Sequence, residues 1–363
     1  MDQQQAHHQS IRTGFQQARQ TPRARHRDIA QALGVSEGEL IASHCGIFGS
    51  AESPLKARRL RGEWPQIIAA LEALGEVMAL TRNASCVHEK IGTYGRASVN
   101  GHVGLVLGGA IDLRLFYDRW AHGFAVQEQL ADGAIQRSLQ FFDAQGQAIH
   151  KVFLKSASRT PVYFDLVERF SARQLSTGLA VVPPPAAVAE TADEGIAIAG
   201  FHTAWTAMRD THEFFGILKK FGLTRTQALR LAPAEYAHQV PTASAHEILN
   251  RAAQEGTPIM VFVGNPGMIQ IHSGPIHRVE VLGPWVNVLD KDFNLHLRED
   301  HIAQAWLVKK PTRDGLVQSI EIFDAQGDTI AMLFGERKPG QAERGDWRGL
   351  LAALSPEGEP CTR

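Results

Sequence analysis

The second half of this chain repeats the first at a spacing of 182 residues. The aligned pairs include Asn83 and Asn265, Gly92 and Gly274, Gly101 and Gly283, and Leu107 and Leu289. After the loss of one residue, the segment FDAQG at 142–146 recurs at 323–327. Chance does not keep register over so long a stretch, so the chain consists of two fused copies of one unit. A single site can arise only from differences between the copies.

Length and composition agree with two globular domains. The chain has 363 residues, of which 44% are hydrophobic and 21% charged, and each copy is long enough to bury a core. A net charge of −1 gives no overall attraction to nucleic acid or anionic lipid. We find no apolar run near the ~18 residues that span a membrane. The three cysteines, Cys45, Cys86 and Cys361, form no CxxC pair, which suits the reducing cytoplasm.

Each copy is predicted to be α+β, with N-terminal helices packed at one side of a large antiparallel sheet. Apolar residues at helical spacing predict the helices, and short apolar runs between Gly, Asn and Asp predict the strands. Gly34 ends one helix, and Ser36 with Glu39 forms a capping box for the next. The expected helices are 25–33, 64–74, 204–221, 225–231 and 245–255. The expected strands are 77–81, 86–91, 103–107, 113–117, 123–129, 136–142, 149–154, 259–263, 268–272, 279–282, 285–289, 295–298, 303–309, 317–323 and 329–334.

Composition also sets the expected domain boundaries. The first thirty residues lack the apolar core of a secretory signal and are predicted to be a polar, partly disordered tail. Three prolines at 183–185 force an extended backbone inside an Ala-rich stretch, which is typical of a linker. We therefore expect a tail at 1–23, repeats at 24–175 and 200–354, a linker at 176–199 and a second tail at 355–363.

His212 lies in the most informative segment, WTAMRDTHEFFG at 205–216. If that segment is helical, Phe215 and Gly216 lie on the same face as the imidazole. The glycine leaves room beside the ring for a flat group to approach. A neutral imidazole can bind a haem iron as its axial ligand. A histidine with a purely structural role is the alternative that the residues alone leave open.

Two arginines are further candidates. Arg225 follows Thr224, a suitable N-cap, and would stand at a helix N-terminus, where an anion such as a carboxylate is stabilised. Arg114 shares one strand face with Asp112 and Phe116 if Leu113 faces the core. Its counterpart in the second copy is His296, so the duplicated positions carry different chemistry. For both arginines, a solvated surface charge is the alternative.

The sequence gives less support to a non-haem metal site or to a DNA-binding site. The pairs His272/His277 and His296/His301 lack a recognised metal-binding spacing. Residues 29–40 resemble a DNA-binding helix-turn-helix, but the second helix begins with Glu37 and Glu39, which phosphate would repel. We interpret the helical hairpins as structural, keep DNA binding as a minor alternative and expect no membrane insertion.

Several segments resemble the bacterial cytoplasmic haem-utilisation proteins of the HemS, ChuS and PhuS kind, the haemin-degrading factors. The resemblance covers about 25–354. Its most specific segments are VHEK at 87–90, IDLRLF at 111–116, DTHEFF at 210–215, QALRLA at 227–232, GPWVNVLD at 283–290 and FNLHLRE at 293–299.

The resemblance implies two similar halves and one molecule of haem b in a cleft between sheet and helices. It makes His212 the axial ligand of the iron and places Arg114 on the distal side, usually through water. It places Arg225 near the propionates and Lys310 and Arg337 among further polar contacts.

The two copies do not carry the same residues at this site. Gly34 aligns with Gly222, 188 positions later, and on that register Ala24 is the counterpart of His212. His26 lies two positions on, but its neighbours are charged rather than aromatic. We therefore expect one haem per chain.

Three functions remain open at this stage. The first is a haem carrier that receives imported haem, for example from an inner-membrane importer, and passes it to a haem oxygenase or another acceptor. The second is a haem-degrading oxygenase that uses O₂ and an external reductant, with Arg114 acting on the distal side. The third is a haem-responsive DNA-binding regulator.

Overall fold

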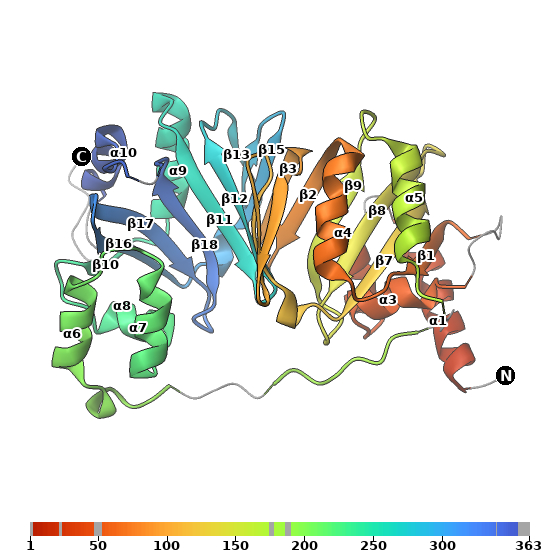
Figure 1. Ribbon diagram of the computed structural model, residues 1–363, viewed down its shortest axis with the longest axis horizontal. Coiled ribbons are helices and arrows are strands. Elements are labelled where there is room, and N and C mark those ends of the chain that lie inside the picture. The colour runs from red at the N-terminus through yellow and green to blue at the C-terminus, as the bar shows by residue number, and fades with distance from the viewer. Residues whose placement is uncertain are drawn as a thin grey trace. The chain divides into compact units, whose positions relative to one another are not determined.

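The computed structural model describes residues 3–21, 24–46, 53–173, 178–185, 190–338 and 340–354. It divides into two compact units (Figure 1). Unit 1 comprises Met1–Arg82, Glu89–Pro185 and Asn265–Gln270, and unit 2 comprises Asn83–His88, Ala186–Gly264 and Ile271–Arg363. The units therefore follow the duplicated halves, apart from two short segments that lie at aligned positions.

Unit 1 begins with three helices and continues with strands and two further helices. The elements of the first half are α1 (Gln3–Ala18), α2 (His26–Ala32), α3 (Glu37–Ser43), β1 (Leu55–Arg59), α4 (Trp64–Ala70), β2 (Glu76–Arg82), β3 (Cys86–Thr93), β4 (Arg96–Asn100), β5 (Val103–Leu107), β6 (Asp112–Phe116), β7 (His122–Gln129), β8 (Ile135–Phe142), β9 (Ala148–Leu154) and α5 (Thr160–Phe170). The Ser36/Glu39 capping box at the start of α3 is confirmed, and Gly34 before it has a φ of 69°.

Unit 2 repeats this plan. The elements of the second half are α6 (Ile198–Thr206), α7 (Glu213–Phe221), α8 (Arg225–Arg230), β10 (Ala237–Val240), α9 (Ser244–Glu255), β11 (Ile259–Asn265), β12 (Met268–Gly274), β13 (Val279–Leu282), β14 (Trp285–Leu289), β15 (Phe293–Arg298), β16 (Gln304–Thr312), β17 (Gly315–Phe323), β18 (Thr329–Gly335) and α10 (Gly345–Ala352).

The strands confirm the predicted α+β class. In unit 1 the run β1-β7-β8-β9-β2 and the meander β4-β5-β6 are antiparallel. Unit 2 contains the matching run β10-β16-β17-β18-β11 and the meander β13-β14-β15. The chain forms two sheets of nine strands each.

Helices cover both faces of each run, in addition to the one helical layer expected. In unit 1, β7 turns Phe124 toward α1–α3 and Ala125 toward α4 and α5. In unit 2, β16 turns Trp306 toward α6–α8 and Leu307 toward α9 and α10. Strands buried on both faces are apolar without strict alternation. A polar side chain within these runs is therefore desolvated and needs a partner.

Residues 3–18 differ from the expected polar tail. They form α1, which buries His8, Ile11 and Phe15, and the last two belong to the core that α2 and α3 share. The residues at 8, 11 and 15 are spaced at i, i+3 and i+7, so one narrow buried stripe with two apolar residues is enough to dock an otherwise polar helix.

No helix in the described part of the chain is both long and apolar enough to cross a membrane.

Candidate functional site

His212 lies on a turn at the start of α7, rather than inside the single helix expected at 204–221. The helix breaks after Thr206 and resumes at Glu213. Asp210 explains the break, because its Oδ1 accepts the backbone N–H of His212 at 2.8 Å. A short polar side chain that bonds its own backbone competes with helix formation and favours a turn or a helix start.

The imidazole of His212 is oriented by the same carboxylate. Its Nδ1 lies 2.6 Å from Oδ1 of Asp210, and the side chain is 87% exposed. Because a carboxylate only accepts, Nδ1 carries the proton and the lone pair lies on Nε2. The backbone N–H of His212 and then its imidazole hold the pKa of Asp210 below its usual range, with a smaller contribution from Arg337, although burial by itself raises that pKa. The carboxylate therefore stays charged at neutral pH. The sequence offered a signal for this pair, a carboxylate two residues before the histidine, which we missed.

His202, another histidine near His212 in the sequence, is engaged elsewhere. Its Nε2 lies 2.7 Å from the carbonyl oxygen of Leu231 and so donates to it. A ring nitrogen that carries a proton for this bond has no lone pair for a metal ion.

Arg225 is the first residue of α8, as expected, and Thr224 is the N-cap, whose hydroxyl accepts from the backbone N–H of Gln227 at 3.2 Å. The guanidinium does not point freely into solvent. Its Nε donates to Oε2 of Glu321 at 2.7 Å, and its Cζ lies 5.2 Å from the ring centroid of Phe214.

Glu321 organises a buried charge cluster that the sequence did not reveal. Its side chain is fully buried on β17, and Oε1 accepts from Nζ of Lys310 at 2.6 Å. Burial by itself raises the pKa of Glu321, but Arg225 and Lys310 hold it well below the usual range. For Lys310 burial dominates and lowers its pKa to about 8. With Glu321 and Lys310 both charged, the formal charges of the three side chains sum to +1.

Phe214 links this cluster to His212. Its ring is buried and lies 4.6 Å from Nζ of Lys310, and Trp205 packs edge-on against it at 4.9 Å between centroids. The neighbouring Phe215 is 76% exposed. The start of α7 therefore carries an oriented imidazole and an exposed ring, and Phe214 between them contacts a cationic cluster.

Arg337 lies close enough to the His212 turn to lower the pKa of Asp210 slightly. Its Nη1 lies 3.7 Å from Oδ2 of Asp314. The backbone N–H of Arg313 donates to the carbonyl oxygen of Arg209 at 3.0 Å, so the hairpin between β16 and β17 fixes the start of the turn.

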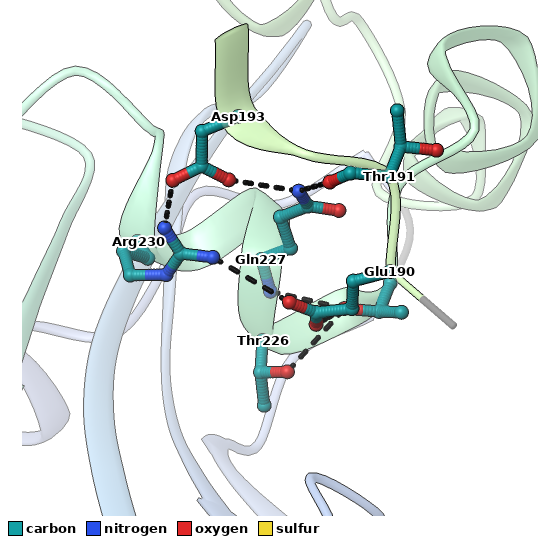
Figure 2. Close-up of polar contacts among 7 residues, drawn as sticks. Glu190, Thr191, Asp193, Thr226, Gln227 and Arg230 are labelled. Atoms are coloured by element: carbon teal, nitrogen blue, oxygen red, sulfur yellow. Dashed lines mark hydrogen bonds and ion pairs between the residues drawn. The ribbon is translucent and has the colours of Figure 1, made fainter. Parts of the chain in front are cut away.

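The end of the linker holds α8 in place (Figure 2). The amide of Gln227 donates to the carbonyl oxygen of Thr191 at 2.6 Å and to Oδ1 of Asp193 at 2.9 Å. Asp193 also pairs with Arg230, and Glu190 accepts from the hydroxyl of Thr224. We call these contacts the linker clasp. The clasp fixes the helix that carries Arg225, although the composition predicted only an extended linker.

Arg114 belongs to unit 1. It lies on β6, where Leu113 and Leu115 are fully buried, as the alternation predicted. The guanidinium of Arg114 pairs with the carboxylate of Asp112, and the Arg114 side chain is 29% exposed. His296, its counterpart on β15, has Nδ1 at 2.7 Å from Oδ1 of Asn287. The two aligned positions therefore do carry different polar partners.

The first copy replaces the residues of the His212 site. His26 occupies the position that aligns with Phe214, and its Nε2 lies 3.0 Å from Oε2 of Glu128. Glu37 aligns with Arg225 and is buried against Lys151 and Arg82. Burial raises the pKa of Glu37, yet the two cations bring it down to about 2. At the equivalent helix start, the first copy therefore has a buried carboxylate, Glu37, where the second copy has Arg225. Ala24, the counterpart of His212, has no side chain that could bind a metal.

The helical hairpins are packed as structural elements. In α3 every residue except Glu39 is buried. The expected recognition helix of a helix-turn-helix thus has its surface in the core of unit 1, so DNA recognition through α3 gains no support.

Known proteins resemble most of the chain, across both copies. The family model of the haemin-degrading HemS/ChuX domain matches it twice, at residues 34–170 and 222–354. The hemin transport protein HemS of Yersinia enterocolitica is 41% identical over 332 residues, which cover 91% of this chain and 92% of that protein.

Two solved structures share the fold. Holo-PhuS, a heme-binding protein from Pseudomonas aeruginosa, matches with a TM-score of 0.91 and 46% identity, covering 96% of this chain and 99% of that one. The heme-degrading enzyme ChuS of Escherichia coli O157:H7 matches with a TM-score of 0.86 and 36% identity, covering 96% and 100%. These matches extend over both copies, and the chain belongs to the haemin-degrading HemS/ChuX-domain family.

Proposed function

We propose that the chain binds one molecule of haem b through Nε2 of His212 and carries it in the cytoplasm. The observation that carries this proposal is the 2.6 Å contact between His212 Nδ1 and Asp210. Metal-ligating histidines commonly donate the other ring N–H to a carboxylate, which fixes the tautomer and raises the basicity of the ligating nitrogen. An exposed imidazole held in this way is ready to take an axial position on iron.

The cationic cluster supports a role in holding the propionates. Arg225 is the partly exposed member of a cluster whose formal charges sum to +1, and it stands at a helix N-terminus. One carboxylate placed beside it would balance that charge. Lys310 is buried against Glu321, so we assign it to supporting Arg225 rather than to direct contact. Arg337 is the second candidate for a propionate, because it lies on the same unit near the His212 turn.

Arg114 is our candidate for the distal side of the haem. Its resemblance to the family's distal arginine supports this role, and its guanidinium keeps further donors beyond the pair with Asp112. In a carrier it would hold a water molecule. In an oxygenase it would orient bound O₂.

A carrier is the function that we favour. A single histidine ligand is exchanged more easily than two, which suits a protein that hands haem on. The HemS and HmuS relatives are named hemin transport proteins. The donor would be an inner-membrane haem importer, and the acceptor a haem oxygenase or another haem-handling protein.

A haem-degrading oxygenase is the second candidate, favoured by the likeness to ChuS, which is described as a heme-degrading enzyme. The sequence has no nucleotide fingerprint for a flavin or NAD, so an external donor would supply the electrons. Ring opening would consume haem as a substrate rather than release it intact.

One experiment separates the two. The haem complex is incubated with O₂, an electron donor and catalase, since catalase removes the peroxide that destroys haem without enzymatic help. A carrier leaves the Soret band intact and transfers haem to apomyoglobin or a haem oxygenase faster than haem dissociates into buffer. Catalase-resistant loss of the band, slowed in Arg114→Ala, contradicts the carrier and establishes the oxygenase. A protein that does neither refutes both.

A further inference from the structure

We propose that Gly216 is the residue that admits a flat macrocycle to His212, and that it sets the specificity of the site for planar ligands. This inference rests on the proposed function, because it concerns the approach of the haem ring to the same imidazole.

Nothing in the packing or the backbone requires glycine at this position. Gly216 lies inside α7, and a Cβ added there would have no described atom within 4 Å. Its φ is not positive, unlike that of Gly222 at the end of the same helix. Glycine inside a helix is roughly fivefold less favourable than alanine in the helix equilibrium. Glycine at 216 therefore destabilises α7, and no feature of the fold explains its presence.

The position matters because of its relation to His212. His212 is the N-cap of α7 and has helical backbone angles, φ −69° and ψ −22°, so the residue four positions later, Gly216, lies beside it on one helix face. Every Cα–Cβ bond of a helix tilts toward the N-terminus, so a side chain at 216 would lean back toward the imidazole. A macrocycle ligated by Nε2 would extend several ångströms around the iron, and a side chain at 216 would stand in its path. Phe215, 76% exposed, would flank it as an apolar contact.

The first copy provides an internal comparison. On the register that pairs Gly34 with Gly222, Asp28 in α2 is the counterpart of Gly216, and Ala24 is the counterpart of His212. The imidazole and the glycine are thus present together in one copy and absent together in the other. If the glycine served the fold of the helical hairpin, both copies would need it.

The test uses Gly216→Ala and Gly216→Leu in the full chain. The matched control is Gly349, a glycine inside α10 that also has no described atom within 4 Å of an added Cβ. Gly→Ala at either position should raise the melting temperature by about 2 °C, since both helices gain the same propensity. Haemin binding should weaken only at 216, by about threefold for alanine and tenfold or more for leucine.

The Soret position and the affinities of the leucine variants complete the test. At saturating haemin, the Gly216 variants should keep the wild-type Soret position, because the ligand to iron is unchanged. If wild type binds one haem through His212 but Gly216→Leu binds haemin as tightly as wild type, the proposal is overturned. Equal weakening of haemin binding in Gly349→Leu would also overturn it. If wild type binds no haem, or if His212→Ala binds as wild type does, the proposed function itself has failed instead.

Discussion

Oδ1 of Asp210 holds His212 twice, by accepting from Nδ1 of the ring at 2.6 Å and from the backbone N–H at 2.8 Å. One oxygen atom thereby sets the start of α7, the rotamer of the imidazole and its tautomer. The chemistry of the site thus depends on a residue that would not itself touch the ligand.

Asp210→Ala should weaken haemin binding by about 10- to 100-fold, the usual effect of losing a partner of a ligating histidine. Asp210→Asn should fall between alanine and wild type, because its amide oxygen still accepts from Nδ1 but carries no charge. Haemin titration checks both variants. Asp346→Ala, which removes an exposed carboxylate on α10, is the control, and equal affinities for all four proteins would refute the role of Asp210.

Arg225→Ala should weaken haemin binding while leaving the spectrum of the bound iron unchanged, because a propionate contact does not reach the metal. It should also cost about 1–3 kcal/mol of stability, since Glu321 keeps only Lys310 as its charged partner. Arg230→Ala on the same helix is the control, because its guanidinium binds the linker rather than Glu321. A changed spin state with normal affinity would place Arg225 in another role.

Much of the fold was predictable because it depends on local pattern. The Ser36 cap, the α8 start at Arg225 and the alternation around Arg114 follow from short spacings, and the structure confirms them. Helix α1 was not predicted because only two buried apolar residues, Ile11 and Phe15, mark it within a polar segment. The break before His212 was not predicted because the apolar spacing favoured one continuous helix over 204–221, and the tendency of Asp210 to form a turn was not considered.

The charge cluster and the linker clasp were not predictable from one sequence. Glu321 pairs with Arg225, which is 96 positions earlier, and only the packed sheet shows that its face of β17 is buried. Likewise, nothing in the composition of the linker indicates that Thr191 and Asp193 bind Gln227. Such contacts depend on the tertiary arrangement rather than on any local period.

The protein should lose stability as the pH falls below 6.5, because two buried histidines resist protonation. Burial lowers the pKa of His150 to about 3 and that of His44 to about 4. A folded pKa below the unfolded value of 6.5 means that the unfolded state takes up the proton first. The stabilisation is complete above 6.5 and is lost as the pH falls toward these values, by about 1 kcal/mol for each histidine between pH 7.5 and 5.5.

Urea unfolding at the two pH values checks this expectation. His150→Gln should flatten the pH dependence by about 1 kcal/mol, whatever its effect on stability at pH 7.5. A slope that stays the same in this variant would mean that His150, which contacts Thr81 and Tyr94, is not one of the responsible groups.

The linker clasp should contribute to stability mainly through Gln227. This side chain is buried, and Gln227→Ala should cost about 1–3 kcal/mol because it leaves the Thr191 carbonyl without its donor. Arg230→Ala should leave the melting temperature nearly unchanged, because the ion pair with Asp193 is exposed to solvent. Thermal melts of the two variants test the contrast, and the reverse order of effects would show that the ion pair dominates.

The most direct test of the central claim is a haemin titration of wild type and His212→Ala, followed at the Soret band. Wild type should show one break at one equivalent, with a spectrum of histidine-ligated iron, and His212→Ala should show a shifted band and weaker binding. A break at two equivalents would contradict the single site and point to His26. An unchanged spectrum and affinity in His212→Ala would contradict the assignment of the ligand.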